Sequence, residues 1–211
     1  MATPLGRLHL VTDCRPGRDP VAVVRAGLSV GVPVVQVRVP DGWTDRAAYE
    51  LASTIEGLCR TAGATCLVND RLQVALAVGA AGGHVGADDL PVRAARLILG
   101  PHAILGGTAR DPSTARAAVA AGASYLGVGP AYPTTTKEGL PAPIGVAGIG
   151  AVAAAVDVPV IAIGAVTAER IPALLDAGAY GVAVVSAVSG AADPASACAR
   201  LLAALPVGDR G

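Results

Sequence analysis

The stretch AAGASYLGVGP, residues 120–130, contains the unit from which the fold of this chain can be predicted. A helical pattern ends at Gly122, and a glycine just past a helix fits a left-handed C-cap. The apolar run at 125–129 follows without a charged residue, as in a strand that is buried on both faces. We therefore interpret the stretch as the end of a helix followed directly by a buried strand.

The same arrangement recurs along the chain. Glycine, a short apolar run and then polar residues appear in SVGVPVVQVR (29–38), TAGATCLVND (61–70), VGAAGGHVG (78–86) and DAGAYGVAVVS (176–186). The pattern predicts eight strands, at residues 8–12, 34–38, 65–69, 83–85, 104–106, 125–129, 160–163 and 181–185. Helical patterns lie between them at 45–61, 112–121 and 168–177, and another follows the last strand at 193–204. Asp111 and Thr167 stand where helix N-caps are expected.

Eight repeated strand–helix units predict an α/β protein that forms a single (β/α)₈ TIM barrel, a parallel eight-stranded barrel with outer helices. We expect one domain over residues 1–211, because the chain has 211 residues and no linker is apparent. A doubly wound open sheet is the main alternative, but eight strands exceed its usual five or six.

Charge is sparse and balanced, with 16 Lys and Arg against 16 Asp and Glu. The zero net charge and the 2% aromatic content argue against a nucleic-acid partner. Glycine and proline interrupt the long uncharged runs, and the N-terminus lacks a long apolar segment, so neither a membrane span nor a signal peptide is expected. The four cysteines show no CxxC spacing and fit a reducing, cytoplasmic location, in which they serve as small buried side chains.

In a barrel of this kind, functional residues lie on the rim formed by the strand ends and the loops that follow them. Polar residues or glycine follow nearly every predicted strand, and in a chain with so little charge this concentration indicates a site. The rim residues are Asp13, Gln36, Arg38, Asn69, Asp70, His84, Asp88, Asp89, Thr108, Arg110, Thr134, Thr135, Thr136, Lys137, Gly164, Thr167, Ser186 and Ser189.

Two groups of charged residues on this rim suggest chemistry with anions. Asp70 and Asp89 could hold one Mg²⁺, which takes one or two protein carboxylates together with phosphate oxygens. The alternative is that each caps the helix that follows it. Arg38 and Lys137 suit phosphate binding, or else ion pairs with these aspartates.

The loops after the seventh and eighth strands are rich in small residues, including Gly164, Ala165, Ser186 and Ala187. In many barrels these loops bind a phosphate through backbone N–H groups, although close packing of strand against helix would explain the small residues equally. Together with the charged groups, they predict two anion sites on one rim: a phosphate here, and a metal-bound diphosphate near the aspartates.

Six motifs stand in order on six successive rim loops: QVR (36–38), VNDR (68–71), HVGADDLP (84–91), GGT (106–108), GPAYPTTTK (129–137) and AIG (162–164). With them the chain resembles the thiamine phosphate synthase (thiamine-phosphate pyrophosphorylase) family over nearly its whole length. The resemblance implies an Mg²⁺-dependent transferase that couples hydroxymethylpyrimidine pyrophosphate to thiazole phosphate in thiamine biosynthesis. Its partners would be phosphorylated small molecules, and a homo-oligomer is left open.

The resemblance also implies roles for individual residues. The pyrimidine pyrophosphate would be held by Gln36, Arg38, Asn69, Thr108 and Lys137. The thiazole phosphate would be held by Thr134, Thr136, Gly164, Ala165, Val185 and Ser186. Asp70 and Asp89 would hold the Mg²⁺, and Arg38, Thr108 and Lys137 are the expected catalytic residues. The reaction would be a substitution at the pyrimidine's methylene carbon, which needs charge neutralisation and alignment more than a general base.

Three positions depart from the family pattern: Pro40 stands where a lysine is usual, Ala165 where a second glycine is usual, and Ala87 where a glutamine is frequent. A lost phosphate contact of the kind that Pro40 implies costs about 1.5–3 kcal/mol, while Arg38 and Lys137 remain. Ala165 keeps its N–H, so we expect its backbone contact to survive if its φ is negative.

Three other functions stay open at this point. A paralogous isomerase that shifts the thiazole phosphate between tautomers usually has a histidine after the glycine that ends the sixth strand, where this chain has Pro130. A non-catalytic paralogue that binds thiamine-type phosphates would be favoured by Pro40 and Ala165. Another phosphate-binding barrel, such as a sugar-phosphate epimerase, would need a clear pair of Asp or His bases.

Overall fold

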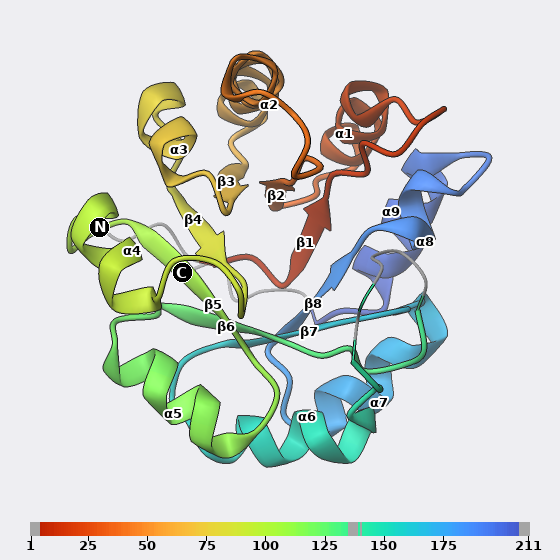
Figure 1. Cartoon of the computed structure of the whole chain (residues 1–211). Coiled ribbons are helices and arrows are strands. Elements are labelled where there is room, and N and C mark those ends of the chain that lie inside the picture. Colours follow the sequence, from red (N-terminus) through yellow and green to blue (C-terminus); the bar gives the residue numbers. More distant parts are fainter. Residues whose placement is uncertain (1–4, 135–138, 140, 207–211) are drawn as a thin grey trace.

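The computed structural model describes residues 5–134, 139 and 141–206. Eight parallel strands close into a barrel in which each strand pairs with the next in sequence and β8 pairs with β1 (Figure 1). The strands are β1 Leu8–Val11, β2 Val34–Val37, β3 Thr65–Asn69, β4 Gly82–Val85, β5 Ile104–Ala109, β6 Tyr125–Val128, β7 Val160–Ile163 and β8 Gly181–Val184. The predicted (β/α)₈ barrel is confirmed.

Helices form the outer layer around the strands (Figure 1). They are α1 Pro20–Ser29, α2 Asp45–Ala62, α3 Leu72–Val78, α4 Val92–Leu99, α5 Pro112–Ala120, α6 Gly145–Ala153, α7 Ile171–Asp176, α8 Ser186–Ser189 and α9 Pro194–Ala203, with a 3-10 helix, η1 Ala168–Arg170, ahead of α7. The helix expected at 168–177 is thus divided between η1 and α7. None of these helices has the length and apolar character that a membrane crossing requires.

The predicted helix caps are partly confirmed. Asp111 caps α5, accepting from the backbone N–H groups of Ser113 and Thr114 at 2.8 and 3.0 Å. Gly122 follows α5 with a φ of +105°, as expected for a left-handed end. Thr167 is the N-cap residue of η1, as expected, but its side chain makes no capping hydrogen bond and is bonded to the Glu169 side chain instead.

The apolar core has two parts. The larger part lies between the strands and the helices and includes Leu10, Ile55 and Leu105. The smaller part includes Val34, Leu67, Tyr125 and Ile161, which lie within the barrel. The strands are therefore buried on both faces, which explains why they appear in the sequence as continuous apolar runs.

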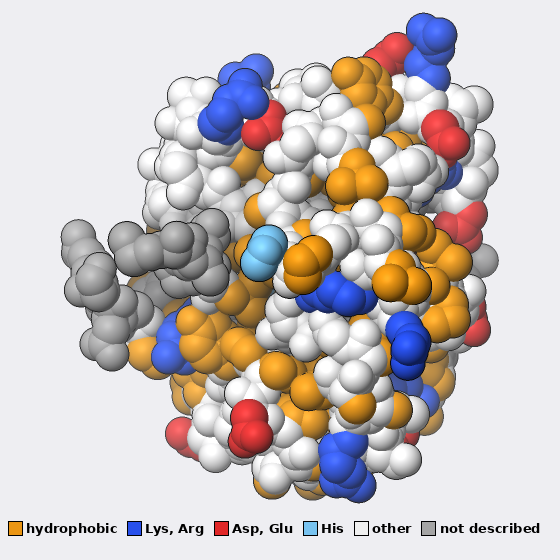
Figure 2. All heavy atoms as spheres, turned by 90° about the vertical axis from the view of Figure 1, so that its left-hand side faces the viewer, with side chains coloured by type: hydrophobic (Ala, Val, Ile, Leu, Met, Phe, Trp, Pro, Cys, Tyr) orange, Lys and Arg blue, Asp and Glu red, His pale blue; other side chains and the backbone are white. Residues whose placement is uncertain are grey.

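A few large apolar side chains remain exposed on the outer helices, among them Leu76 on α3 and Leu97 and Ile98 on α4. Leu97 is 80% exposed. Figure 2 shows this side of the barrel, where hydrophobic side chains alternate with basic ones. Single exposed apolar residues are common on protein surfaces.

Replacing either of two glycines by alanine should change the stability of the fold, in opposite directions. A Cβ added at Gly82 on β4 would lie 1.8 Å from the backbone oxygen of Ile104, whereas one added at Gly57 in α2 would meet nothing within 4 Å. We expect Gly82→Ala to lower the free energy of unfolding by at least about 2 kcal/mol. Gly57→Ala should raise it by about 0.5–1 kcal/mol, because alanine favours the helix interior. Urea unfolding measures both, and a stable Gly82→Ala protein would contradict the packing described.

Candidate active site

A cavity of about 470 Å³ lies at the carboxyl ends of the strands, and its size is typical of small-molecule sites. Every candidate site residue that the structure describes lines it. These residues are Gln36, Arg38, Asn69, Asp70, Asp89, Thr108, Thr134, Gly164, Ala165, Val185 and Ser186. Two further candidates, Thr136 and Lys137, lie outside the described residues. The fold thus brings the described candidates from both expected subsites to one cavity.

Two amide side chains meet where β2 and β3 end. Gln36 is buried, and its Nε2 donates a hydrogen bond to Oδ1 of Asn69 at 2.9 Å. The two residues come from neighbouring parallel strands, so the barrel's register brings them within reach. Their mutual hydrogen bond fixes the orientation of both amides toward the cavity, as a substrate-binding role requires.

Asp70 and Asp89 line the cavity and do not cap the helices that follow. The N-cap of α3 is Arg71 and that of α4 is Pro91, and neither helix has a side-chain cap. Asp70 has a φ of +62°, its backbone N–H donates to the His84 carbonyl at 2.9 Å, and its Oδ1 atom is buried. Oδ2 of Asp89 accepts from the N–H of Gly86 at 2.7 Å. The capping alternative for these aspartates is therefore wrong.

The carboxylates of Asp70 and Asp89 are of the ligand type that magnesium takes, and both residues line the cavity. In the part of the chain that the structure describes, no group of three or more His, Cys, Asp or Glu side chains could hold a metal. Mg²⁺ is commonly bound through one or two carboxylates together with phosphate oxygens and water. Asp70 and Asp89 supply that smaller number of ligands on a cavity wall.

Arg38 lines the cavity and is half-buried, and its backbone is held by Thr12, the residue that follows β1. Its N–H donates to Oγ1 of Thr12 at 2.8 Å, and its carbonyl accepts from the same hydroxyl at 2.7 Å. Among the described residues, Arg38 forms no ion pair, so the alternative of a bridge to Asp70 or Asp89 is not observed for it. Its guanidinium is placed to bind an anion in the cavity.

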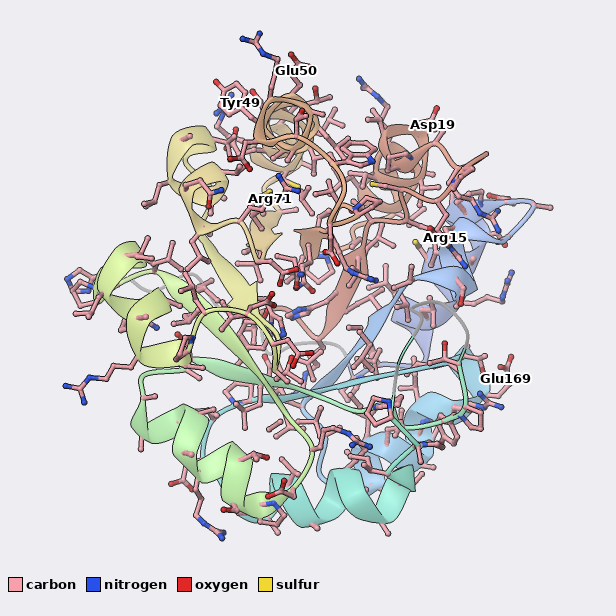
Figure 3. The ribbon with its side chains drawn as sticks, in the orientation of Figure 1. Arg15, Asp19, Tyr49, Glu50, Arg71 and Glu169 are labelled. Carbon is pink, nitrogen blue, oxygen red and sulfur yellow. The ribbon has the colours of Figure 1, made fainter. Side chains whose placement is uncertain are left out.

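Arg71, the last residue of the VNDR motif, has a structural role. Its Nη1 donates to Oδ1 of Asp45 at 2.7 Å and its Nη2 to the carbonyl of Trp43 at 2.6 Å, so it fixes the loop between β2 and α2 (Figure 3). Pro40 lies in this loop, is exposed and does not line the described cavity, and its carbonyl accepts from the Trp43 N–H.

Polar aromatic and imidazole groups lie on the cavity floor inside the barrel. His84 contacts Oγ1 of Thr108 through Nε2 at 3.0 Å and the hydroxyl of Tyr125 through Nδ1 at 3.1 Å. Burial lowers the pKa of His84 to about 4, so the ring is neutral at physiological pH. The ring of His9 packs edge-on against that of Tyr125, and burial lowers the pKa of His9 to about 3.

From the sequence, His84 is one of the rim residues without an assigned role, and Tyr125 is not singled out. Tyr125 stands within an apolar strand and was assigned to the core. The glycines on the neighbouring strands are the feature of the sequence that relates to these rings. A Cβ at Gly106 would lie 2.2 Å from Nδ1 of His84 and 2.3 Å from Cζ of Tyr125. A Cβ at Gly127 would lie 2.8 Å from Cε1 of His84. These glycines make room for the rings.

Some polar rim residues do not face the cavity. Asp13 accepts from Nη2 of Arg15 at 2.7 Å and from the hydroxyl of Ser189 at 2.6 Å, joining the loop after β1 to α8. The Arg15 guanidinium holds the pKa of Asp13 well below its usual range. Asp13 and Ser189 therefore stabilise the junction between the first and last units of the barrel.

The loop after β7 is strained where it reaches the cavity. Gly164 has a φ of +107°, and a Cβ there would lie 2.6 Å from Cβ of Pro130. Ala165 has a φ of +48°, so the condition of a negative φ is not met, and any phosphate contact of its backbone is made from the left-handed conformation. Asp70 and Ala165 are the described non-glycine residues with positive φ, and both line the cavity. Strain of this kind concentrates at functional sites.

A closed parallel barrel whose cavity is lined by carboxylates, an arginine and small-residue loops at the strand ends belongs to the class of barrel enzymes that act on phosphorylated small molecules. The family model of thiamine monophosphate synthase matches residues 8–188, and the chain belongs to this family. The thiamine-phosphate synthase of Salinispora tropica is 70% identical over 203 residues, covering 95% of this chain and 98% of the relative.

Other relatives agree with this assignment. The thiamine-phosphate synthase of Salinispora arenicola is 68% identical, again covering 95% of this chain and 98% of the relative. The solved structure of thiamine phosphate pyrophosphorylase from Pyrococcus furiosus has a TM-score of 0.85 at 34% identity and covers 94% of both chains. The family resemblance inferred from the six rim motifs is confirmed.

The buried histidines predict that the protein loses stability as the pH falls. Their folded pKa values of about 3 and about 4 lie below the ordinary 6.5, so between pH 6.5 and 4 the unfolded chain binds protons that the folded protein does not. We expect the free energy of unfolding to fall by up to about 1.4 kcal/mol per pH unit for each histidine in this window. Urea unfolding between about pH 7 and 5, where carboxylates stay ionised, measures the slope. His84→Gln should roughly halve the slope of stability against pH, and the control His102→Gln, at an exposed position, should not. A stability that is independent of pH would contradict the assignment of buried neutral histidines.

Proposed function

We propose that this chain joins hydroxymethylpyrimidine pyrophosphate to thiazole phosphate, forming thiamine phosphate and releasing pyrophosphate. The observation that carries the proposal is the convergence of both expected subsites on one cavity. Arg38, Asn69 and Asp70 lie on the β2 and β3 ends, and Thr134 and Gly164 lie on the loops after β6 and β7. The family membership supports the same reaction.

In this reaction the bond between the pyrimidine's methylene carbon and the pyrophosphate oxygen breaks, and the thiazole nitrogen forms a bond to the same carbon with its lone pair. No proton has to be moved at the reacting atoms. A cavity whose two buried histidines are neutral and whose other polar groups are amides, hydroxyls, carboxylates and guanidinium groups suits such chemistry. The main demands are neutralisation of the leaving pyrophosphate and alignment of the two substrates.

Arg38 would neutralise part of the charge on the leaving pyrophosphate, and Lys137 is proposed as a second cation. Asp70 and Asp89 would hold the Mg²⁺, which supplies further positive charge to the pyrophosphate when it is bound. Gln36 and Asn69, locked together by their hydrogen bond, would orient the pyrimidine substrate. Thr108 would also orient the pyrimidine substrate, through a hydroxyl whose direction is set by its hydrogen bond with His84.

The thiazole phosphate would lie against Thr134, Thr136, the loop after β7 and the start of α8. Gly164 and Ala165 bring backbone to the cavity wall on one side, and Val185 and Ser186 do so on the other. Binding both substrates on one rim converts an encounter of two molecules into an oriented reaction within a complex, which is worth several kcal/mol of activation free energy.

We further propose a cytoplasmic location. All four cysteines are free, and Cys59, Cys66 and Cys198 are buried, which fits a reducing compartment. The isomerase alternative receives no support from the site, since the position where that group has a histidine is Pro130, which lines the cavity.

The direct test mixes the purified protein with both substrates and Mg²⁺ and measures thiamine phosphate. We expect product that depends on both substrates, with pyrophosphate released in equal amount. Incubating the protein with the thiazole phosphate alone distinguishes the isomerase, which would shift the tautomer without the pyrimidine substrate. Failure to form product at high enzyme concentration would sink the synthase proposal.

Asp70→Asn tests the magnesium site with little change in shape, since asparagine tolerates the left-handed backbone at this position. We expect kcat/KM to fall by roughly tenfold to a hundredfold, equivalent to about 1.4–2.8 kcal/mol, with a higher Mg²⁺ concentration needed for half-maximal rate. Asp157→Asn, an exposed position ahead of β7, is the matched control and should keep full activity. Unchanged activity and Mg²⁺ dependence in Asp70→Asn would refute the metal role.

A further inference from the structure

We propose that Arg170 is a positioning residue for the thiazole phosphate subsite. It would hold the loop after β7 in its left-handed conformation and tie that loop to the one after β6. This inference rests on the proposed function, because it assigns a residue that shapes a subsite of that reaction. Arg170 itself is exposed at the end of η1 and does not line the cavity.

The first contact of Arg170 is with the strained residue. Its Nη1 donates a hydrogen bond to the carbonyl of Ala165 at 2.6 Å. Ala165 has a φ of +48°, which a glycine adopts freely and an alanine does not. A charged donor on this carbonyl fixes the peptide that follows Ala165, and so it opposes the return of Ala165 to an ordinary negative φ.

The second contact of Arg170 is with the neighbouring loop. Its Cζ atom lies 4.4 Å from the ring centroid of Tyr132, a distance typical of a cation–π contact. Tyr132 is two residues before Thr134, which lines the cavity. One guanidinium therefore contacts both loops from which the phosphate subsite is built.

Backbone hydrogen bonds link these two loops directly. The N–H of Ala131 donates to the carbonyl of Ile163 at 2.7 Å, and that of Tyr132 donates to the carbonyl of Gly164 at 3.3 Å. On the cavity side, Gly164 packs closely against Pro130. Arg170 contacts the same pair of loops from outside the cavity, since it is exposed and does not line the cavity. Its neighbour Glu169 lies at the outer edge of the barrel (Figure 3).

The support from Arg170 should affect binding of the thiazole phosphate and leave the pyrimidine side alone. Without it, Ala165 can relax toward negative φ, which moves the backbone that lines the cavity at 164 and 165 and weakens the link to Tyr132. Four described residues are expected to hold the pyrophosphate and lie at the ends of β2, β3 and β5: Gln36, Arg38, Asn69 and Thr108. None of them contacts Arg170, and the fifth, Lys137, lies outside the described residues.

Isothermal calorimetry with the thiazole phosphate tests this inference without turnover. We expect Arg170→Ala to raise the Kd on the order of threefold to tenfold, the range of one ordinary net hydrogen bond, because Arg170 acts on the subsite through the backbone and does not contact the ligand. In steady-state assays the KM for the thiazole phosphate should rise similarly, with the KM for the pyrimidine pyrophosphate unchanged. Arg60→Ala is the matched control, since Arg60 is an exposed arginine whose side chain pairs with Glu56 on α2.

Two further variants separate positioning from a general charge effect. Arg170→Lys keeps the charge and loses the planar group, so it should recover only part of the affinity. In the Ala165→Gly background, Arg170→Ala should cost less than in the wild type, because glycine has no strain to release. Equal losses in both backgrounds would mean that Arg170 does not act through Ala165 and would overturn the inference.

The outcomes also separate this inference from the proposed function. If the wild type binds the thiazole phosphate and forms no product, the synthase proposal fails and the comparison of Kd values still decides the role of Arg170. If the wild type and Arg170→Ala bind equally, the inference is overturned while the synthase proposal stands. Absence of binding by the wild type would overturn both. Circular dichroism and thermal unfolding establish that each variant is folded.

Discussion

The pairing of β1 with β8 is the constraint on which the rest of the structure depends. Leu8, His9 and Leu10 pair with Val182, Ala183 and Val184, so the sheet has no free edge among its eight strands. Because all the strands are parallel, closure brings their carboxyl ends to one rim. Residues as far apart in sequence as Gln36 and Ser186 then line the same cavity. The contact of Asp13 with Ser189 stabilises this junction on the rim itself.

Closure also creates an interior that has to be filled, and this chain fills it partly with polar rings. Tyr125, His9 and His84 pack together within the barrel, where the glycines of β5 and β6 leave room for them. Charged imidazoles would be costly at this depth, and burial keeps both histidines neutral. The floor of the cavity is thus polar without being charged, while two arginines and three aspartates supply charge at its walls: Arg38, Arg110, Asp70, Asp88 and Asp89.

Much of this arrangement could be predicted from the sequence because the barrel is built from a local, repeated unit. Each strand is a short apolar run behind a helix-ending glycine, and polar residues mark its carboxyl end, so the strands, their order and the rim were all accessible. The same logic placed Asp70, Asp89 and Thr108 on the rim. It failed where contacts between units decide the outcome. Asp13 is on the rim but bonds to Ser189, and Tyr125 is in an apolar strand but contacts a cavity-lining histidine.

The backbone conformations of Asp70 and Ala165 are a further feature that depends on contacts distant from the local sequence. Neither residue type favours φ values of +62° and +48°, so local sequence preferences would not have predicted them. In both cases a contact with a residue farther along the chain holds the conformation. The carbonyl of His84 on the neighbouring strand accepts from the N–H of Asp70, and Arg170 at the end of η1 donates to the carbonyl of Ala165. The two strained residues flank opposite ends of the expected substrate pair, one beside the leaving pyrophosphate and one beside the thiazole phosphate. On the proposed placement of the substrates, the end beside Ala165 can therefore be tuned by Arg170 from outside the cavity, whereas the end beside Asp70 depends on His84, which lines the cavity itself.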